Sequence, residues 1–156
     1  MSIWIGVDPG SKGAVAAIYD DNGVQRVAVA GWDNMLFVSF CKAFKDRADE
    51  NGEQIVAAVE KVGAVHGNGL VSTFSFGKNA GFIEGVLSTL NIGYQLVPPK
   101  KWKDAFSLNS DKAKSIEVCK RLFPDVSLKR TERCKTDSDG LAESILISEW
   151  CRRTMK

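Results

Sequence analysis

The segment from Gln54 to Val62 constrains the fold more than any other part of this chain. It reads QIVAAVEKV, and a strand this apolar is typically buried on both faces, as in a parallel sheet covered by helices. We therefore predict an α/β fold with this strand inside the sheet. Glu60 is an anomaly at the carboxyl end of the strand, because a buried carboxylate is costly unless it has a partner.

The N-terminal region predicts three antiparallel strands. Apolar residues alternate with others through residues 3–8 and the pattern stops at Pro9 and Gly10. Residues 14–19 and 24–30 are two further β-rich runs, and the Asn-Gly pair between them favours a tight hairpin. The first and third strands of such a meander run the same way, so a helix after the third strand would be a crossover. The strand ending at Glu60 would then lie parallel to the first strand, which ends at Asp8.

The rest of the chain predicts helices and one more strand. Asp33 is a candidate cap for a helix that runs to about Glu50 and ends at Gly52, with Leu36, Phe40 and Phe44 on one face. The later elements are a glycine-rich loop over 61–71, a helix over 72–90, a strand over 94–97, a short helix over 102–106, and helices over 110–123 and 137–153. We expect one domain over residues 1–156 with a five-stranded mixed sheet, three strands antiparallel and two parallel, flanked by helices.

Four carboxylates are expected at one place in this fold. Asp8 and Glu60 end two neighbouring strands, and reactive crevices in open α/β sheets lie beyond the carboxyl ends of strands. Asp139 and Glu143 are four apart, which puts them on one face of the last helix even though like charges repel at that spacing. An all-oxygen set of this kind suits Mg²⁺ or Mn²⁺, and two such ions could activate water and stabilise the leaving oxygen of a phosphodiester. Each acid also has an ordinary interpretation, as a turn residue, an ion-pair partner or a residue at the positive end of a helix.

Charge is unevenly distributed along the chain. The formal net charge is +2, but residues 98–135 hold 11 Lys and Arg against 5 Asp and Glu, a net charge of +6. A basic stretch suggests a polyanionic partner, although solvated helix faces would look the same. The four cysteines are far apart with no metal-ligand spacing, so we expect reduced thiols. No membrane span or signal segment is evident, and we expect a cytoplasmic protein that is not membrane-bound.

Five segments together resemble a known family. In order they read IGVDPGSKGAVA, VEKV, SFGKNAGFIEGVL, VPPKKWKDAF and TDSDGLAESILI. They resemble the RuvC-type Holliday junction resolvases, particularly the compact phage and organellar branch, from residue 3 to about residue 150. The resemblance is weaker between residues 30 and 52. It implies an RNase H-like fold, a homodimer in the cytoplasm of a bacterial or phage-infected cell, and symmetric nicking of four-way DNA junctions with Mg²⁺.

The resemblance also implies roles for individual residues. Asp8, Glu60, Asp139 and Glu143 would hold the metal, and Lys103 and Lys112 would neutralise charge at the scissile phosphate. Many relatives space the two helix acids three apart rather than four, so Asp137 is an alternative ligand. Asp137 has a second interpretation as a helix cap shared with Thr136. Asp139 is favoured because residues four apart share a helix face.

Further residues are candidates for contact with DNA. Val65 and His66 lie in the glycine-rich loop, where relatives insert a side chain into the junction. The other candidates lie in the basic stretch: Lys100, Lys101, Lys114, which competes with Lys112 for its role, and Arg130. In the helix over 72–90, Gly77, Gly81 and Gly85 recur every four residues beside several phenylalanines. That ridge fits either a dimer seam or core packing.

Several functions remain open from the sequence. The favoured one is a metal-dependent crossover junction endodeoxyribonuclease that makes paired symmetric nicks. A broader nuclease for forks and flaps, or a module that binds junctions without cutting, are the alternatives. The Asp-Pro-Gly turn also resembles the phosphate loop of actin-like sugar kinases, but the second domain and second loop of those proteins are not visible. We therefore expect no nucleotide cofactor.

Overall fold

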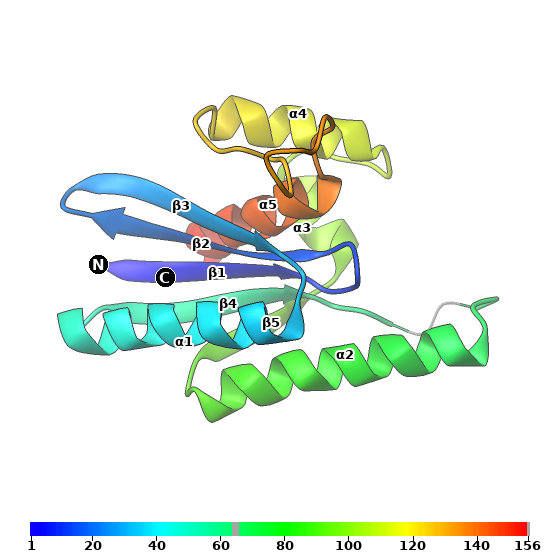
Figure 1. Ribbon diagram of the computed structural model, residues 1–156, viewed down its shortest axis with the longest axis horizontal. Helices are drawn as coiled ribbons and strands as arrows, with labels where there is room; N and C mark the ends of the chain where they lie inside the picture. Colours follow the sequence, from blue (N-terminus) through cyan, green and yellow to red (C-terminus); the bar gives the residue numbers. More distant parts are fainter. Residues whose placement is uncertain (64–65, 156) are drawn as a thin grey trace.

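The computed structural model describes residues 1–63 and 66–155 as a single mixed sheet with helices on both faces (Figure 1). The elements are β1 (Ser2–Asp8), β2 (Ala14–Asp21), β3 (Val24–Gly31), α1 (Asn34–Asn51), β4 (Gln54–Glu60), α2 (Leu70–Thr89), β5 (Gly93–Val97), α3 (Pro99–Ala105), α4 (Lys112–Leu122) and α5 (Asp139–Thr154). The strand order is β3-β2-β1-β4-β5, with β1 to β3 antiparallel and β4 and β5 parallel to β1. This confirms the predicted five-stranded sheet and the crossover that lays β4 beside β1.

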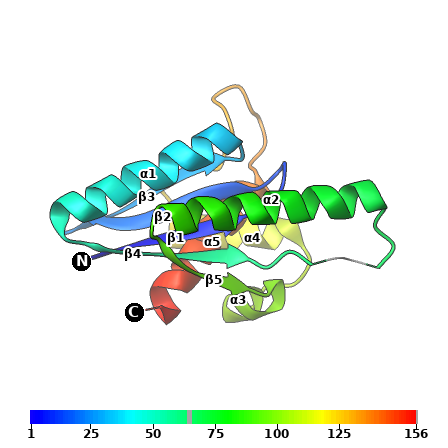
Figure 2. The same cartoon turned by 90° about the horizontal axis from the view of Figure 1, so that it is seen from below.

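Two helical layers cover the sheet. Helices α1 and α2 lie on one face, and α3, α4 and α5 on the other (Figure 2). One core joins Ile3, Ile5 and Val7 of β1 to α1 and α2, and the other joins the opposite face of the sheet to α5, α3 and α4. The end of α2 that follows residues 61–69 extends well past the sheet (Figure 1).

Helix α5 is the best-buried helix. Every residue from Gly140 to Cys151 is buried. Gly6 of β1 lets the helix backbone approach closely, because a Cβ built there would lie 2.2 Å from the carbonyl oxygen of Ser144 and 2.2 Å from the nitrogen of Ser148. The Ser148 hydroxyl also donates to the carbonyl oxygen of Trp4, at 2.7 Å. The carboxylates at the start of α5 are therefore held against the strand that ends at Asp8.

Local signals for the turn and the first helix are confirmed. Asn22 and Gly23 both have positive φ, at 55° and 82°, as the tight hairpin requires. The Asp33 carboxylate accepts a hydrogen bond from the amide of Leu36 at 2.9 Å and caps α1. Gly52 ends α1 in the left-handed conformation, with φ of 65°.

Some local predictions were wrong. Of the predicted face of α1, Phe40 and Phe44 pack against the core but Leu36 is 52% exposed, and the helix buries Phe37 and Cys41. Helix α3 begins at Pro99, since a proline in the first turn needs no amide partner. The cap of α5 is Ser138, whose hydroxyl accepts from the amide of Leu141, rather than Asp137 or Thr136.

In the chain from residue 1 to 63 and from 66 to 155, no helix is both long and apolar enough to cross a membrane. The four cysteines are free thiols, and three of them are buried.

Candidate active site

Two strands bring Asp8 and Glu60 together. Val7 of β1 pairs with Val59 of β4 in the parallel ladder, so Asp8 and Glu60 follow at the same step of the two neighbouring strands. Each residue ends its strand and is partly buried. The expectation that these two carboxylates meet at the carboxyl edge of the sheet is confirmed.

Helix α5 adds the other two carboxylates. Asp139 is its first residue, and Glu143 follows one turn later with only 7% of its surface exposed. Close packing of α5 on β1 places both acids near Asp8, since the negative charges of Glu143 and Asp139 both act on the Asp8 carboxyl. The structure therefore gathers the four acids that the sequence singled out, from two strands and one helix.

The close approach of these acids changes the pKa of Asp8 in particular. Burial, followed by the negative charges of Glu60 and Glu143, raises the pKa of Asp8 from 3.8 to about 8. Burial also raises the pKa of Glu143, and the charge of Lys103 opposes that rise. Carboxyl groups whose pKa values are raised by burial and by neighbouring acids are typical of functional sites.

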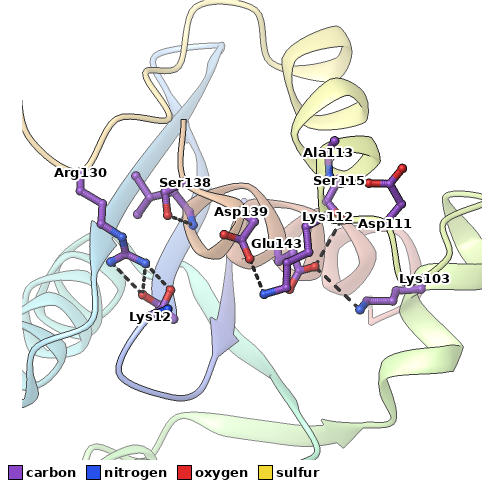
Figure 3. A network of polar contacts seen from close by, with 12 residues as sticks. Lys12, Lys103, Asp111, Lys112, Ala113, Ser115, Arg130, Ser138, Asp139 and Glu143 are labelled. Carbon is purple, nitrogen blue, oxygen red and sulfur yellow. Dashed lines mark hydrogen bonds and ion pairs between the residues drawn. The ribbon is translucent and has the colours of Figure 1, made fainter. Parts of the chain in front are cut away.

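Two lysines place positive charge beside the acids of α5 (Figure 3). The Lys112 ammonium lies 2.6 Å from Oδ2 of Asp139, and the Lys103 ammonium lies 3.7 Å from Oε1 of Glu143. The hydrogen bond to Asp139 raises the pKa of Lys112. Burial alone would raise the pKa of Asp139, but the Lys112 hydrogen bond and charge hold that pKa below its usual value. Both lysines thus lie where negative charge is concentrated.

Two buried side chains hold glutamates of the site by hydrogen bonds. The indole Nε1 of Trp102 donates to Oε2 of Glu60 at 2.7 Å, and the hydroxyl of Ser115 donates to Oε1 of Glu143 at 3.3 Å. Trp102 is 0% exposed and Ser115 is 1% exposed. Sequence reasoning missed both residues. Trp102 had a weak signal, as an aromatic residue inside the basic run KKWK, whereas Ser115 had none.

The donor set fits a divalent cation by its chemistry. All four groups offer carboxylate oxygens, which Mg²⁺ and Mn²⁺ prefer, and a cation would oppose both the burial and the repulsion that raise the pKa of Asp8. Among residues 1–63 and 66–155, no three His, Cys, Asp or Glu side chains are grouped closely enough to hold an ion as they stand. Asp139 and Glu143 instead face Lys112 and Lys103.

Arg130 is exposed, but its side chain is held by hydrogen bonds to the backbone. Its guanidinium donates to the carbonyl oxygens of Lys12 and Gly13, in the loop that follows Asp8 (Figure 3). Gly31 and Gly140 leave room for it, because a Cβ on either would lie 2.8 Å from a guanidinium nitrogen. Arg130 therefore joins the loop after β1 to the start of α5; its contact with DNA stays a prediction.

The other candidates for DNA contact lie on the surface. Lys100 is paired with Asp104 at 2.6 Å, and the Lys101 ammonium lies 5.7 Å from the centre of the Trp150 ring. Lys114 is exposed on α4, and His66 is exposed in a turn. Val65 falls outside the described residues.

Asp137 and Asp139 have different ion-pair partners, and only the partner of Asp139 is one of the two lysines beside the cluster. It forms an ion pair with Lys120, near the end of α4, and it precedes the cap of α5. If the four acids hold a divalent cation, Asp139→Asn should weaken Mn²⁺ binding at least 100-fold, as loss of a ligand should exceed the 10- to 100-fold effect of outer partners. Asp137→Asn is the matched control and should change Mn²⁺ affinity less than about threefold, since Asp137 is paired with Lys120, whose side chain is 55% exposed, and the pair lies apart from Lys112 and Lys103. Calorimetric Mn²⁺ affinities of the two variants, measured side by side, decide the assignment; a larger loss in Asp137→Asn would reverse it.

Solved structures of known proteins share the fold of this chain. No protein-family model matches the chain, and no curated protein matches its sequence. Among solved structures, Thermus thermophilus RuvC matches with a TM-score of 0.57 and 15% identity, over 97% of this chain and 95% of RuvC. The fowlpox virus Holliday junction resolvase matches with a TM-score of 0.56 and 19% identity, over 98% and 99% of the two chains. The yeast mitochondrial Holliday junction resolvase gives a TM-score of 0.51 and 16% identity, over 95% of this chain and 77% of that one. The chain thus has the fold of the RuvC-type resolvases, and the expected RNase H-like fold is confirmed.

Proposed function

We propose that this chain is a metal-dependent, structure-selective endonuclease that resolves four-way DNA junctions by paired symmetric nicks. One observation carries the proposal: Asp8, Glu60, Asp139 and Glu143 converge beside two lysines at the carboxyl edge of the sheet. A protein that only binds DNA has no need for buried carboxylates, which repel phosphates. The structural neighbours agree with this function, since one is T. thermophilus RuvC in complex with a Holliday junction substrate.

The four carboxylates would hold the ions, two per site in this proposal, with Mn²⁺ able to replace Mg²⁺. Bound ions would supply an activated water and charge stabilisation at the leaving oxygen of the phosphodiester. Lys112 and Lys103 would turn from Asp139 and Glu143 to the phosphate and balance its negative charge there. The lysines thus neutralise the carboxylates before DNA arrives and the phosphate afterwards.

Basic residues around the site would contact the DNA backbone. Lys100, Lys101 and Lys114 belong to the stretch with a net charge of +6, and all three are exposed. Contacts of this kind give affinity that falls steeply with salt and carries little sequence information.

Paired nicks require two active sites, and we assign the second to another copy of the chain. Leu70, Val71 and Phe74 are 90%, 80% and 75% exposed on the part of α2 that extends past the sheet. The glycine ridge of α2 is open, because a Cβ on Gly81 or Gly85 would meet nothing within 4 Å. The exposure of Phe74 disfavours core packing for this end of the helix and supports a role of α2 as the dimer seam.

A charge on this surface should therefore break the dimer. We expect Phe74→Glu to be monomeric by light scattering and to nick junctions singly, because the exposed site tolerates glutamate in a lone chain but not in an apolar interface. Met35→Glu is the matched control, since Met35 is 76% exposed on α1. A Phe74→Glu variant with unchanged mass in solution would reject this seam.

The function is tested by nicking of end-labelled junctions, forks, flaps and linear duplex with Mg²⁺, with Mn²⁺ and with chelator. Paired symmetric nicks restricted to the four-way junction would support the proposal. Equal cutting of forks and flaps would establish a broader debranching nuclease instead. Binding without cutting under every metal condition would establish a junction-binding module and overturn the proposal.

A further inference from the structure

Trp102 has a feature that packing alone does not require. It is fully buried in the core formed by the sheet, α3, α4 and α5, where leucine or phenylalanine would fill space without a polar atom. A buried indole N–H needs an acceptor, and this one uses Oε2 of Glu60 at 2.7 Å. The partner is thus a carboxylate of the candidate site rather than a backbone carbonyl.

The backbone explains how the two side chains meet. Glu60 pairs with Val97 at the end of the β4–β5 ladder, and the amide of Lys61 donates to the carbonyl of Val97 at 2.7 Å. Pro98 and Pro99 then turn the chain into α3, which brings Trp102 back to the end of β4. The aromatic ring that contacts Glu60 therefore comes from α3, the helix that directly follows the neighbouring strand β5.

We infer that Trp102 is a positioning residue that fixes the carboxylate of Glu60 for metal binding. The indole N–H only donates and carries no charge, so it orients one oxygen without neutralising the group. It leaves Oε1 available to a cation, whereas a lysine at this place would compete with the cation. This inference rests on the proposed metal-dependent function.

Trp102 also lies beside Lys103, the lysine that faces Glu143. The Lys103 ammonium is 5.3 Å from the centre of the Trp102 ring, within reach of a cation–π interaction, and 3.7 Å from Oε1 of Glu143. One rigid ring therefore contacts both Glu60 and the lysine that faces Glu143. Because the core holds the ring, the direction of its N–H is set before any metal binds.

The test is Mn²⁺ binding to the full chain without DNA, measured by calorimetry. We expect Trp102→Phe to weaken Mn²⁺ binding about tenfold, in the range found for outer partners of metal ligands. Junction binding in chelator should stay unchanged, because no DNA contact is removed. Trp4→Phe is the matched control, since the indole of Trp4 also packs on this core but donates to the carbonyl of Met155, at 3.3 Å.

A double-mutant cycle separates positioning from general damage to the core. In a Glu60→Ala background, adding Trp102→Phe should leave Mn²⁺ affinity unchanged, because the group that the indole orients is gone. If Trp102→Phe does not fold, benzothienylalanine at position 102 keeps the ring shape and lacks the N–H. Equal Mn²⁺ affinities of Trp102→Phe and Trp4→Phe, or an undiminished effect in Glu60→Ala, would overturn the inference. Absence of Mn²⁺ binding by the wild-type chain would instead reject the proposed function.

Discussion

Asp8→Asn is expected to abolish junction cleavage and at the same time to raise the melting temperature of the metal-free protein. Cleavage should fall more than about 100-fold, because an amide binds a divalent cation far less well than the carboxylate at the centre of the cluster. Stability should rise, because the amide carries no charge in a place where burial and neighbouring acids oppose one. A residue kept for function at a cost in stability is expected to behave this way.

The raised pKa of Asp8 determines the direction in which the stability of the folded chain changes with pH. The pKa of Asp8 is about 8 in the folded chain and close to 3.8 when unfolded, so the folded chain binds more protons between these values. The contribution of Asp8 to stability in chelator should therefore be greatest below about pH 4 and be lost as pH rises to about 8. Each unit of pKa shift corresponds to about 1.4 kcal/mol, so the total effect is on the order of a few kcal/mol.

Thermal melts in chelator from pH 5 to pH 9 measure this effect. Asp8→Asn should melt about 5 °C or more above wild type at pH 9, given ~2–4 °C per kcal/mol for a chain of this size. The gap should narrow toward pH 5, where Asp8 is already neutral. Asp125→Asn, at an exposed site, is the control and should track the wild type. A gap that is absent at pH 9, or that grows toward low pH, would contradict the charge crowding around Asp8.

Metal binding should show the same proton linkage. Asp8 must lose its proton to bind a cation, so Mg²⁺ affinity and cleavage should both increase with pH up to about 8. The ion should also remove most of the pH dependence of the melting temperature. Repeating the melts with Mg²⁺ present tests this point in the same experiment.

Features that depend on neighbouring residues could be predicted from the sequence. The hairpin at Asn22 and Gly23 and the cap at Asp33 follow from short-range backbone chemistry, and both were predicted. The meeting of Asp8 and Glu60 follows from strand direction and the crossover rule, which also need no side-chain detail.

The features that escaped prediction depend on contacts between distant segments. The Trp102–Glu60 hydrogen bond joins residues 42 apart, and the Arg130 contact with Gly13 spans 117. No periodicity marks either pair. The cap of α5 is Ser138 rather than Thr136 or Asp137, and because all three residue types are good caps the local sequence does not choose among them.

Gly6→Ala is the second large expected effect, and it tests the packing that assembles the site. The added methyl would lie 2.2 Å from backbone atoms of both Ser144 and Ser148. These atoms belong to a helix that is buried on all sides, so the clash cannot be relieved by a side-chain rotation. We expect a loss of about 3 kcal/mol or more, at the upper end for overpacking, and a fall in melting temperature of about 10 °C.

Gly93→Ala is the matched control, because Gly93 lies in β5 of the same sheet and a Cβ there meets nothing within 4 Å. It should melt within about 2 °C of wild type, since surface substitutions usually change stability by less than 0.5 kcal/mol. Any Gly6→Ala protein that folds should also bind Mn²⁺ poorly, because α5 must move away from β1 and carry Asp139 and Glu143 with it. A Gly6→Ala variant with wild-type melting and Mn²⁺ binding would show that α5 does not rest on β1 this closely. The assembly of the four carboxylates would then need another explanation.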